Sequence, residues 1–166
     1  MTPSAKAILR EADLPAHWGH LPGYGEIISD PKKLPPYTED LGGGATHEVD
    51  LGGTERWLKD GELHRDGDLP AYAGADGIRM WWQHGQLHRD GDQPAVVRPN
   101  GTQEWYQNGK RHRDGDLPAV IHASGTRYWY RHGIRHRGGG KPAVICPDGA
   151  NEWWVDGFRV DSPKPE

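Results

Sequence analysis

A 24-residue unit recurs along this 166-residue chain, and its clearest copy begins WYQNGKRHRDGDLPAV at Trp105. Three residue types return at this step, in the series Trp57, Trp81, Trp105, Trp129 and Trp153, the series His64, His88, His112 and His136, and the series Pro70, Pro94, Pro118 and Pro142. A fixed period of this length is typical of architectures in which one supersecondary unit stacks on copies of itself. The sequence therefore predicts one elongated repeat domain rather than two globules.

Each unit contains two dipeptides that favour tight turns. The first set is Asp60-Gly61, His84-Gly85, Asn108-Gly109, His132-Gly133 and Asp156-Gly157, and the second is Asp76-Gly77, Asn100-Gly101, Ser124-Gly125 and Asp148-Gly149. Runs of roughly four to six residues rich in Trp, Tyr, Val and Ile separate the turns, which is the length and composition of strands. We predict an all-β fold of tandem 24-residue β-hairpin or meander repeats that form an elongated, twisted antiparallel sheet.

The first turn of each unit fixes a strand register. If Asn108-Gly109 occupies the centre of a two-residue type I′ turn, Tyr106 lies opposite Arg111 and Trp105 lies opposite His112. Opposed residues share a face of an antiparallel pair. One face should then carry the Trp and His series as structural pairs, and the other a row of aromatic and arginine side chains. This second row is the candidate interface, namely Trp82, Tyr106, Tyr130, Trp154, Arg111 and Arg135.

The second turn predicts the rest of the first face by the same argument. With Asn100-Gly101 as central residues, Val96 lies opposite Trp105. The equivalent pairs are Val120 with Trp129, Val144 with Trp153, and Tyr72 with Trp81. The predicted face is a row of Val–Trp–His triplets.

The chain divides into three parts. Residues 1–46 lie outside the repeat and should form a short N-terminal helix from Thr2 to Ala12, followed by a loop-rich segment. This segment is either a cap over the first repeat or a mobile arm. Residues 47–160 form the repeat domain, with a half repeat, four repeats and a truncated fifth, and residues 161–166 form a tail.

Composition narrows the function classes. The formal net charge of −4 gives no electrostatic footprint for nucleic acid. The single cysteine, Cys146, excludes an intramolecular disulfide and fits a reducing compartment. No apolar run has membrane-spanning length and no secretory signal opens the chain, so we expect a cytoplasmic protein without a membrane partner.

The repeated histidines favour a structural role over chemistry. An active site is built once from groups in unlike environments, whereas these groups recur at equal intervals. Successive histidines should be ~14 Å apart if a unit contributes three strands, and ~10 Å apart if it contributes two. Both distances are too wide for shared zinc coordination, so we expect no catalytic residue, no metal and no cofactor.

Paired aspartates follow each histidine except the last. Asp66-Gly67-Asp68, Asp90-Gly91-Asp92 and Asp114-Gly115-Asp116 have the oxygen ligands that Ca²⁺ prefers, but the fourth copy is Gly138-Gly139-Gly140. Either the last site is lost or each carboxylate serves the next unit. Solvated turn aspartates are the simpler interpretation.

The string Asn108-Gly109-Lys110-Arg111-His112 after an aromatic residue resembles a MORN-type repeat, with Tyr106, Gly109 and His112 as its core. The resemblance covers residues 54–160 and departs in unit length, in the Arg-Asp-Gly-Asp segment and in the added Pro-Ala step. The fuller unit is similar to repeat proteins of bacteria, phages and large DNA viruses. It implies a twisted antiparallel sheet used for assembly or binding, and some MORN-type bacterial proteins resemble antitoxin or immunity components. The resemblance implies no catalytic residue.

These observations predict a non-catalytic protein-binding module, with an inhibitor, immunity or anti-defence role of phage or bacterial origin by resemblance. The partner is another protein, and sheet ends or aromatic faces could also pair two copies of the chain. One alternative is sequestration of a nucleotide-like molecule or Ca²⁺. A second alternative is an enzyme with one irregular site near the N-terminal segment, built from His17, His20, His47 and Asp50.

Overall fold

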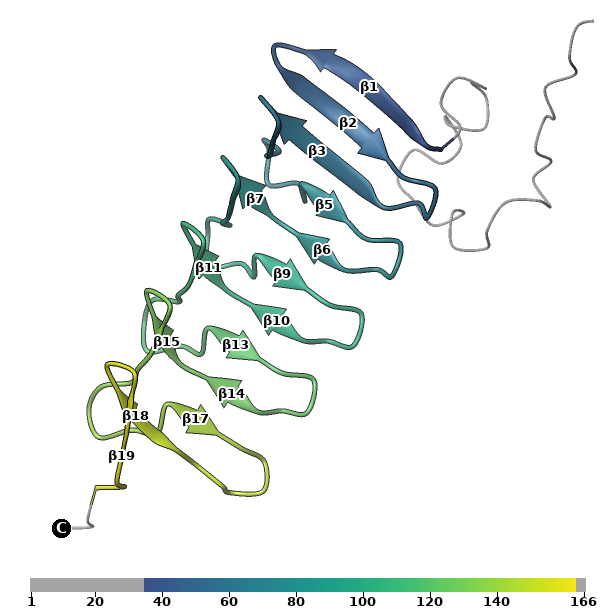
Figure 1. Ribbon diagram of the computed structural model, residues 1–166. Helices are drawn as coiled ribbons and strands as arrows, with labels where there is room; N and C mark the ends of the chain where they lie inside the picture. The colour runs from purple at the N-terminus through teal and green to yellow at the C-terminus, as the bar shows by residue number, and fades with distance from the viewer. Residues whose placement is uncertain (1–34, 164–166) are drawn as a thin grey trace, which may run out of the picture.

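The computed structural model describes residues 35–163, and these residues form strands and turns without a helix (Figure 1). The helix predicted from Thr2 to Ala12 lies outside the described residues. The all-β prediction is confirmed for residues 35–163. The sheet begins at Tyr37, inside the segment that we expected to be loop-rich.

One long antiparallel sheet follows the chain as a meander, with strand order β1-β2-β3-β5-β6-β9-β10-β13-β14-β17. Its strands are β1 (Tyr37–Gly42), β2 (Ala45–Val49), β3 (Glu55–Lys59), β5 (Tyr72–Ala73), β6 (Arg79–Met80), β9 (Val96–Val97), β10 (Gln103–Glu104), β13 (Val120–Ile121), β14 (Arg127–Tyr128) and β17 (Val144–Ile145). Strand β4 (Glu62–Leu63) pairs with β3 outside this order. Figure 1 shows the successive hairpins stacked along an elongated, twisting sheet.

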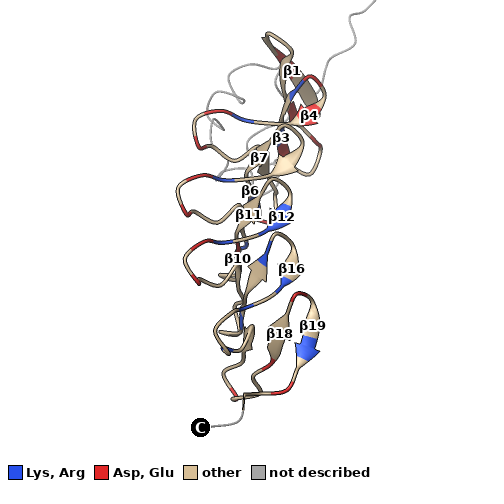
Figure 2. Cartoon of the chain, turned by 90° about the vertical axis from the view of Figure 1, so that its left-hand side faces the viewer, with Lys and Arg blue, Asp and Glu red and all other residues tan. Residues whose placement is uncertain are grey.

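Short hairpins branch from the long sheet. They are β7–β8 (Trp82–Gln83 and Gln86–Leu87), β11–β12 (Tyr106–Gln107 and Lys110–Arg111), β15–β16 (Tyr130–Arg131 and Ile134–Arg135) and β18–β19 (Trp153–Val155 and Phe158–Val160). A tryptophan stands at each branch point. The Trp105 N–H donates to the Ala119 carbonyl in the long sheet (2.8 Å), and the Trp105 carbonyl accepts from the His112 N–H in the hairpin (3.1 Å). Figure 2 shows the hairpins and the Asp-Gly-Asp loops leaving the sheet on opposite sides.

The hairpin register agrees with the prediction. Tyr106 pairs with Arg111, and Asn108 has a positive φ of 48° beside Gly109 at 74°. The equivalent pairs are Leu58 with Leu63, Trp82 with Leu87, Tyr130 with Arg135, and Trp154 with Arg159. Both central residues of the turn are left-handed, as a type I′ turn requires.

The register across the second turn was predicted wrongly by one residue. Val96 pairs with Glu104, not with Trp105, and the Arg98 N–H donates to the Thr102 carbonyl (3.0 Å). The other pairs are likewise displaced, to Val120 with Tyr128, Val144 with Glu152, and Tyr72 with Met80. The connection has three residues and a single left-handed position at Gly101 (φ 88°), so it adds one residue to the loop. Because a one-residue slip exchanges the faces of a strand, the Val–Trp–His triplets do not form.

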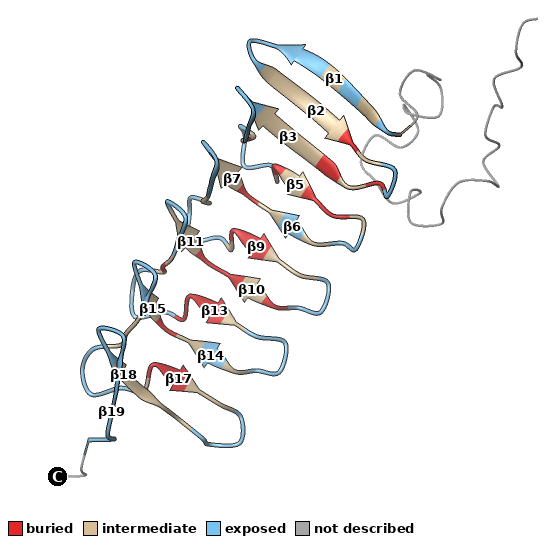
Figure 3. Cartoon of the chain, in the orientation of Figure 1, coloured by how far each residue is buried: buried red, intermediate tan, exposed pale blue. Residues whose placement is uncertain are grey.

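The core is a narrow column rather than a deep interior. Figure 3 shows the buried residues gathered along the middle of the stack. They include Ala71, Ala95, Ala119 and Ala143, then Val96, Val120 and Val144, then Trp81, Trp105 and Trp129. The alanine of each Pro-Ala step is fully buried where its carbonyl accepts from the N–H of the preceding tryptophan, which explains why that position is small.

Candidate functional site

An arginine of the following loop links each Asp-Gly-Asp loop to the next unit. The Arg89 guanidinium lies 3.7 Å from the Trp81 ring centroid, and Arg89 Nη1 donates to the Pro94 carbonyl (3.2 Å). Its Nε and Nη2 donate to the two carboxylate oxygens of Asp68, 21 residues earlier (2.7 and 3.1 Å). The same contacts recur for Arg113 with Trp105, Pro118 and Asp92, and for Arg137 with Trp129, Pro142 and Asp116. The side chain that covers each of these indoles is thus an arginine, which the sequence reasoning missed.

Each repeated histidine also joins two units. His112 Nδ1 accepts a hydrogen bond from the backbone N–H of His132 in the next unit (3.3 Å), and its Nε2 lies 3.1 Å from an Asp114 oxygen. Because a backbone donor occupies Nδ1, the neutral ring carries its proton on Nε2 and donates to the carboxylate. His64 and His88 make the equivalent pairs of contacts, and His136 makes the backbone contact.

These contacts occupy the Asp-Gly-Asp carboxylates. The first aspartate of each loop accepts from histidine, and the second accepts from the arginine of the next unit. Hydrogen bonds from Arg137 and Lys141 lower the pKa of Asp116 to about 2. In the last loop Gly140 replaces the second aspartate, and Asp161 stands where another arginine would be needed to bind it. Within residues 35–163, no group of three or more His, Cys, Asp or Glu side chains is placed to hold a metal ion.

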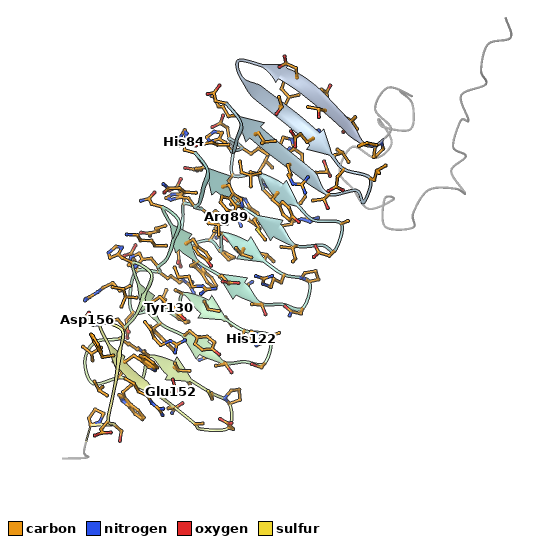
Figure 4. All side chains as sticks on the ribbon, in the orientation of Figure 1. His84, Arg89, His122, Tyr130, Glu152 and Asp156 are labelled. Carbon is orange, nitrogen blue, oxygen red and sulfur yellow. The ribbon has the colours of Figure 1, made fainter. Side chains whose placement is uncertain are left out.

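The short hairpins stack through their turns. The Gly109 N–H donates to the Leu87 carbonyl of the preceding hairpin (2.9 Å). The equivalent bonds run from Gly85 to Leu63, from Gly133 to Arg111, and from Gly157 to Arg135. This ladder brings the side chains of successive hairpins next to one another along the stack (Figure 4).

The candidate interface residues form a row in which aromatic and arginine side chains alternate. Arg111 lies 5.6 Å from the ring centroids of both Tyr106 and Tyr130. Arg135 lies 5.6 Å from Tyr130 and 4.8 Å from Trp154. We call this row, with Trp82 one unit earlier, the aromatic–arginine side. All six side chains are partly exposed.

Glu104 lies buried beneath this row of side chains and was not identified from the sequence. It accepts hydrogen bonds from Arg111 Nε and Nη2 (3.1 and 2.9 Å), Arg98 Nη2 (3.1 Å) and the Tyr106 hydroxyl (3.1 Å). Burial raises the pKa of Glu104, but the bonds from Arg111, Arg98 and Tyr106 outweigh that effect and lower the pKa below its usual value. Glu104 lies opposite Val96 only because of the three-residue loop at Gly101, so the predicted register did not identify it.

Of the four residues named for the irregular N-terminal site, the structure describes His47 and Asp50. His47 Nε2 lies 2.8 Å from a Glu55 oxygen, and the His47 ring stacks on Trp57 with centroids 4.4 Å apart. Asp50 instead shapes the adjoining turn, where it accepts from the Gly52 and Thr54 N–H groups. His17 and His20 lie outside the described residues.

Comparison with known proteins gives no relative, because no protein-family model, curated protein or solved structure matches this chain. In the part of the chain that the structure describes, no helix has the length and apolar character needed to cross a membrane.

Proposed function

We propose that this chain is a non-catalytic protein-binding module, and that its binding surface is the aromatic–arginine side. The proposal depends on one observation, which is that side-chain hydrogen bonding and exposure differ between the two sides of the sheet. On the loop side, the repeated His and Arg side chains, and the second Asp of each Asp-Gly-Asp loop, are hydrogen-bonded to neighbouring units. On the hairpin side, the aromatic rings and guanidinium groups remain partly exposed.

The chemistry of this side fits a protein partner. Tryptophan, tyrosine and arginine are the residues most enriched at the energetic centres of protein interfaces. The tips of the same hairpins add exposed apolar side chains, with Ile134, Val155 and Phe158 on β16, β18 and β19. Phe158 is 76% exposed, which is unusual for a phenylalanine that no partner covers.

The biological role rests on the MORN-type resemblance alone. That resemblance supports an inhibitor, immunity or anti-defence protein of phage or bacterial origin, and the cytoplasmic location is expected from the composition. The partner would then be the protein that this chain inhibits or neutralises.

A capture experiment with matched variants tests the proposal. Tagged intact chain, Tyr130→Ala and Trp154→Ala on the aromatic–arginine side, and Leu117→Ala on the loop side are incubated with host lysate, and circular dichroism checks that each variant is folded. We expect wild type and Leu117→Ala to capture a specific protein from the lysate, and both aromatic variants to fail to capture it. Equal capture by all four proteins would reject this surface.

A second candidate function is sequestration of a small ligand, and one observation favours it. Two hollows of about 510 and 470 Å³ lie one unit apart on the loop side, lined in part by Trp105 and Arg113 in one and by Trp129 and Arg137 in the other. A ligand that binds only the folded state raises the melting temperature by mass action. Thermal shifts with nucleotides or Ca²⁺, reversed by EDTA for the cation, would favour this function over protein binding.

A further inference from the structure

Two equivalent arginines on the aromatic–arginine side have unlike partners. Arg111 donates two hydrogen bonds to the carboxylate of Glu104. One unit later the residue equivalent to Glu104 is Tyr128, so Arg135 meets a ring at 5.5 Å instead of a carboxylate. Arg135 Nη2 donates to the Tyr130 hydroxyl (3.1 Å), and Arg135 Nη1 lies 3.9 Å from a Glu152 carboxylate oxygen.

A hollow of about 370 Å³ lies between these two arginines. Its charged lining consists of Arg98, Arg111, Arg135 and Glu104, and Tyr128 and Tyr130 form aromatic walls. The Glu104 side chain is only 6% exposed, whereas Arg98, Arg111 and Arg135 are 38%, 42% and 28% exposed. The groups that solvent reaches are therefore cationic, and the single carboxylate is beneath them.

We propose that this hollow binds a carboxylate side chain from an acidic segment of the partner protein, with Arg135 as the principal contact. The inference rests on the proposed function, because it assigns the partner's chemistry at the same surface. Tyr128 in place of glutamate leaves the Arg135 guanidinium with only a distant carboxylate, Glu152 at 3.9 Å, and without the direct hydrogen bonds that Glu104 gives Arg111. A carboxylate from the partner would supply those bonds. Guanidinium groups bind carboxylates through paired charge-assisted hydrogen bonds.

The distribution of charge supports an acidic partner. The net charge of the chain is −4, yet Figure 2 shows basic residues on β12, β16 and β19 on the hairpin side and acidic residues at the tips of the opposite loops. An acidic segment is therefore attracted to the hairpins around β12 and β16, whereas β4 on the same side is acidic and the opposite loops carry both signs (Figure 2). The tyrosine rings beside Arg135 can pack against the aliphatic stem of a glutamate.

Binding of a hexaglutamate peptide to the intact chain, measured by fluorescence anisotropy at low salt, tests the inference. Hexaglutamine and inorganic phosphate serve as ligand controls. Arg135→Gln should weaken hexaglutamate binding about tenfold, as expected for loss of a charge-assisted hydrogen bond. Tyr128→Glu should weaken it at least as much, because the new carboxylate would bind Arg135 from within as Glu104 binds Arg111.

The controls separate this site from general attraction. Arg131→Gln removes an exposed arginine that pairs with Asp156 outside the hollow, and it should leave binding within about twofold, as an exposed ion pair contributes little. Arg135→Lys should restore part of the affinity, and Tyr128→Glu should keep the wild-type melting temperature. An equal loss in Arg131→Gln, or phosphate binding as tight as hexaglutamate, would overturn the inference. If hexaglutamate does not bind while Tyr130→Ala still abolishes capture, the acidic segment is rejected and the protein-binding function stands.

Discussion

The carboxylate of Asp116 accepts hydrogen bonds from both Nε and Nη2 of Arg137, at 2.8 and 3.1 Å, across 21 residues of chain. The same pair joins Asp92 to Arg113 and Asp68 to Arg89. Each unit thus presents an acceptor that only the next unit fills. Stability in such a stack depends on contacts between neighbours, since a single unit buries little apolar surface by itself.

Replacement of Asp116 by asparagine should make stability less sensitive to acid. The folded pKa of Asp116, about 2, is below its unfolded value of ~3.9, so the pair stabilises the protein fully above pH 4 and loses its effect as the pH falls toward 2. We expect Asp116→Asn to cost about 1 kcal/mol or less at pH 7, because the carboxylate is partly exposed and screened. Melting temperatures from pH 7 to pH 2 should converge with wild type at the acid end. Asp161→Asn, an exposed aspartate, is the control, and a constant difference for Asp116→Asn across this range would contradict the assignment.

Replacement of Arg113 by alanine should destabilise the stack more than replacement of Arg131. Arg113 covers the Trp105 ring at 3.9 Å and bonds to Asp92 and to the Pro118 carbonyl. Loss of these contacts should lower the free energy of unfolding by about 1–3 kcal/mol in urea denaturation. Arg131 is exposed and pairs only with a partly exposed aspartate, so Arg131→Ala should stay within about 0.5 kcal/mol. Similar losses of unfolding free energy in the two variants would show that Arg113 does not hold adjacent units together.

Two glycine-to-alanine changes test the conformation of the second turn. Gly101 has a φ of 88°, and Gly138 has no positive φ. A Cβ atom at Gly101 would meet nothing within 4 Å, and one at Gly138 would approach only His136 Nε2 at 3.9 Å. Both sites therefore have room for a Cβ atom, so the backbone conformation determines how each substitution changes stability. Gly101→Ala should cost about 1–2 kcal/mol, and Gly138→Ala should be neutral or stabilise by about 0.4–1 kcal/mol. A reversed order in chemical denaturation would contradict the left-handed conformation of Gly101.

The hairpin register could be predicted because Asn108-Gly109 supplies two residues that tolerate positive φ, and a type I′ turn needs both. The second register could not be taken from its Asn-Gly dipeptide alone. In that loop Asn100 is right-handed or extended and only Gly101 is left-handed. Pro99 and Pro147 precede the dipeptide and suit the second position of a type I turn, which is the signal that distinguishes the longer loop.

The candidate site was predictable where it depends on strand register and not where it depends on contacts between units. Period and register placed Tyr106, Tyr130 and Arg111 on one face. They could not place Arg113 over Trp105, because that contact depends on how the loop folds back onto the branch point. The Asp–Arg link had one sequence signal, the replacement of the last paired aspartate by Gly140 in the unit that no complete unit follows.

The most direct test of the account combines thermal unfolding and partner capture for the variant with His88, His112 and His136 all changed to alanine. If these histidines hold units together and the opposite side binds the partner, the free energy of unfolding falls by about 3 kcal/mol. Capture below the melting transition should then remain at the wild-type level. Wild-type stability with abolished capture would contradict the account, because it would place the function on the histidines.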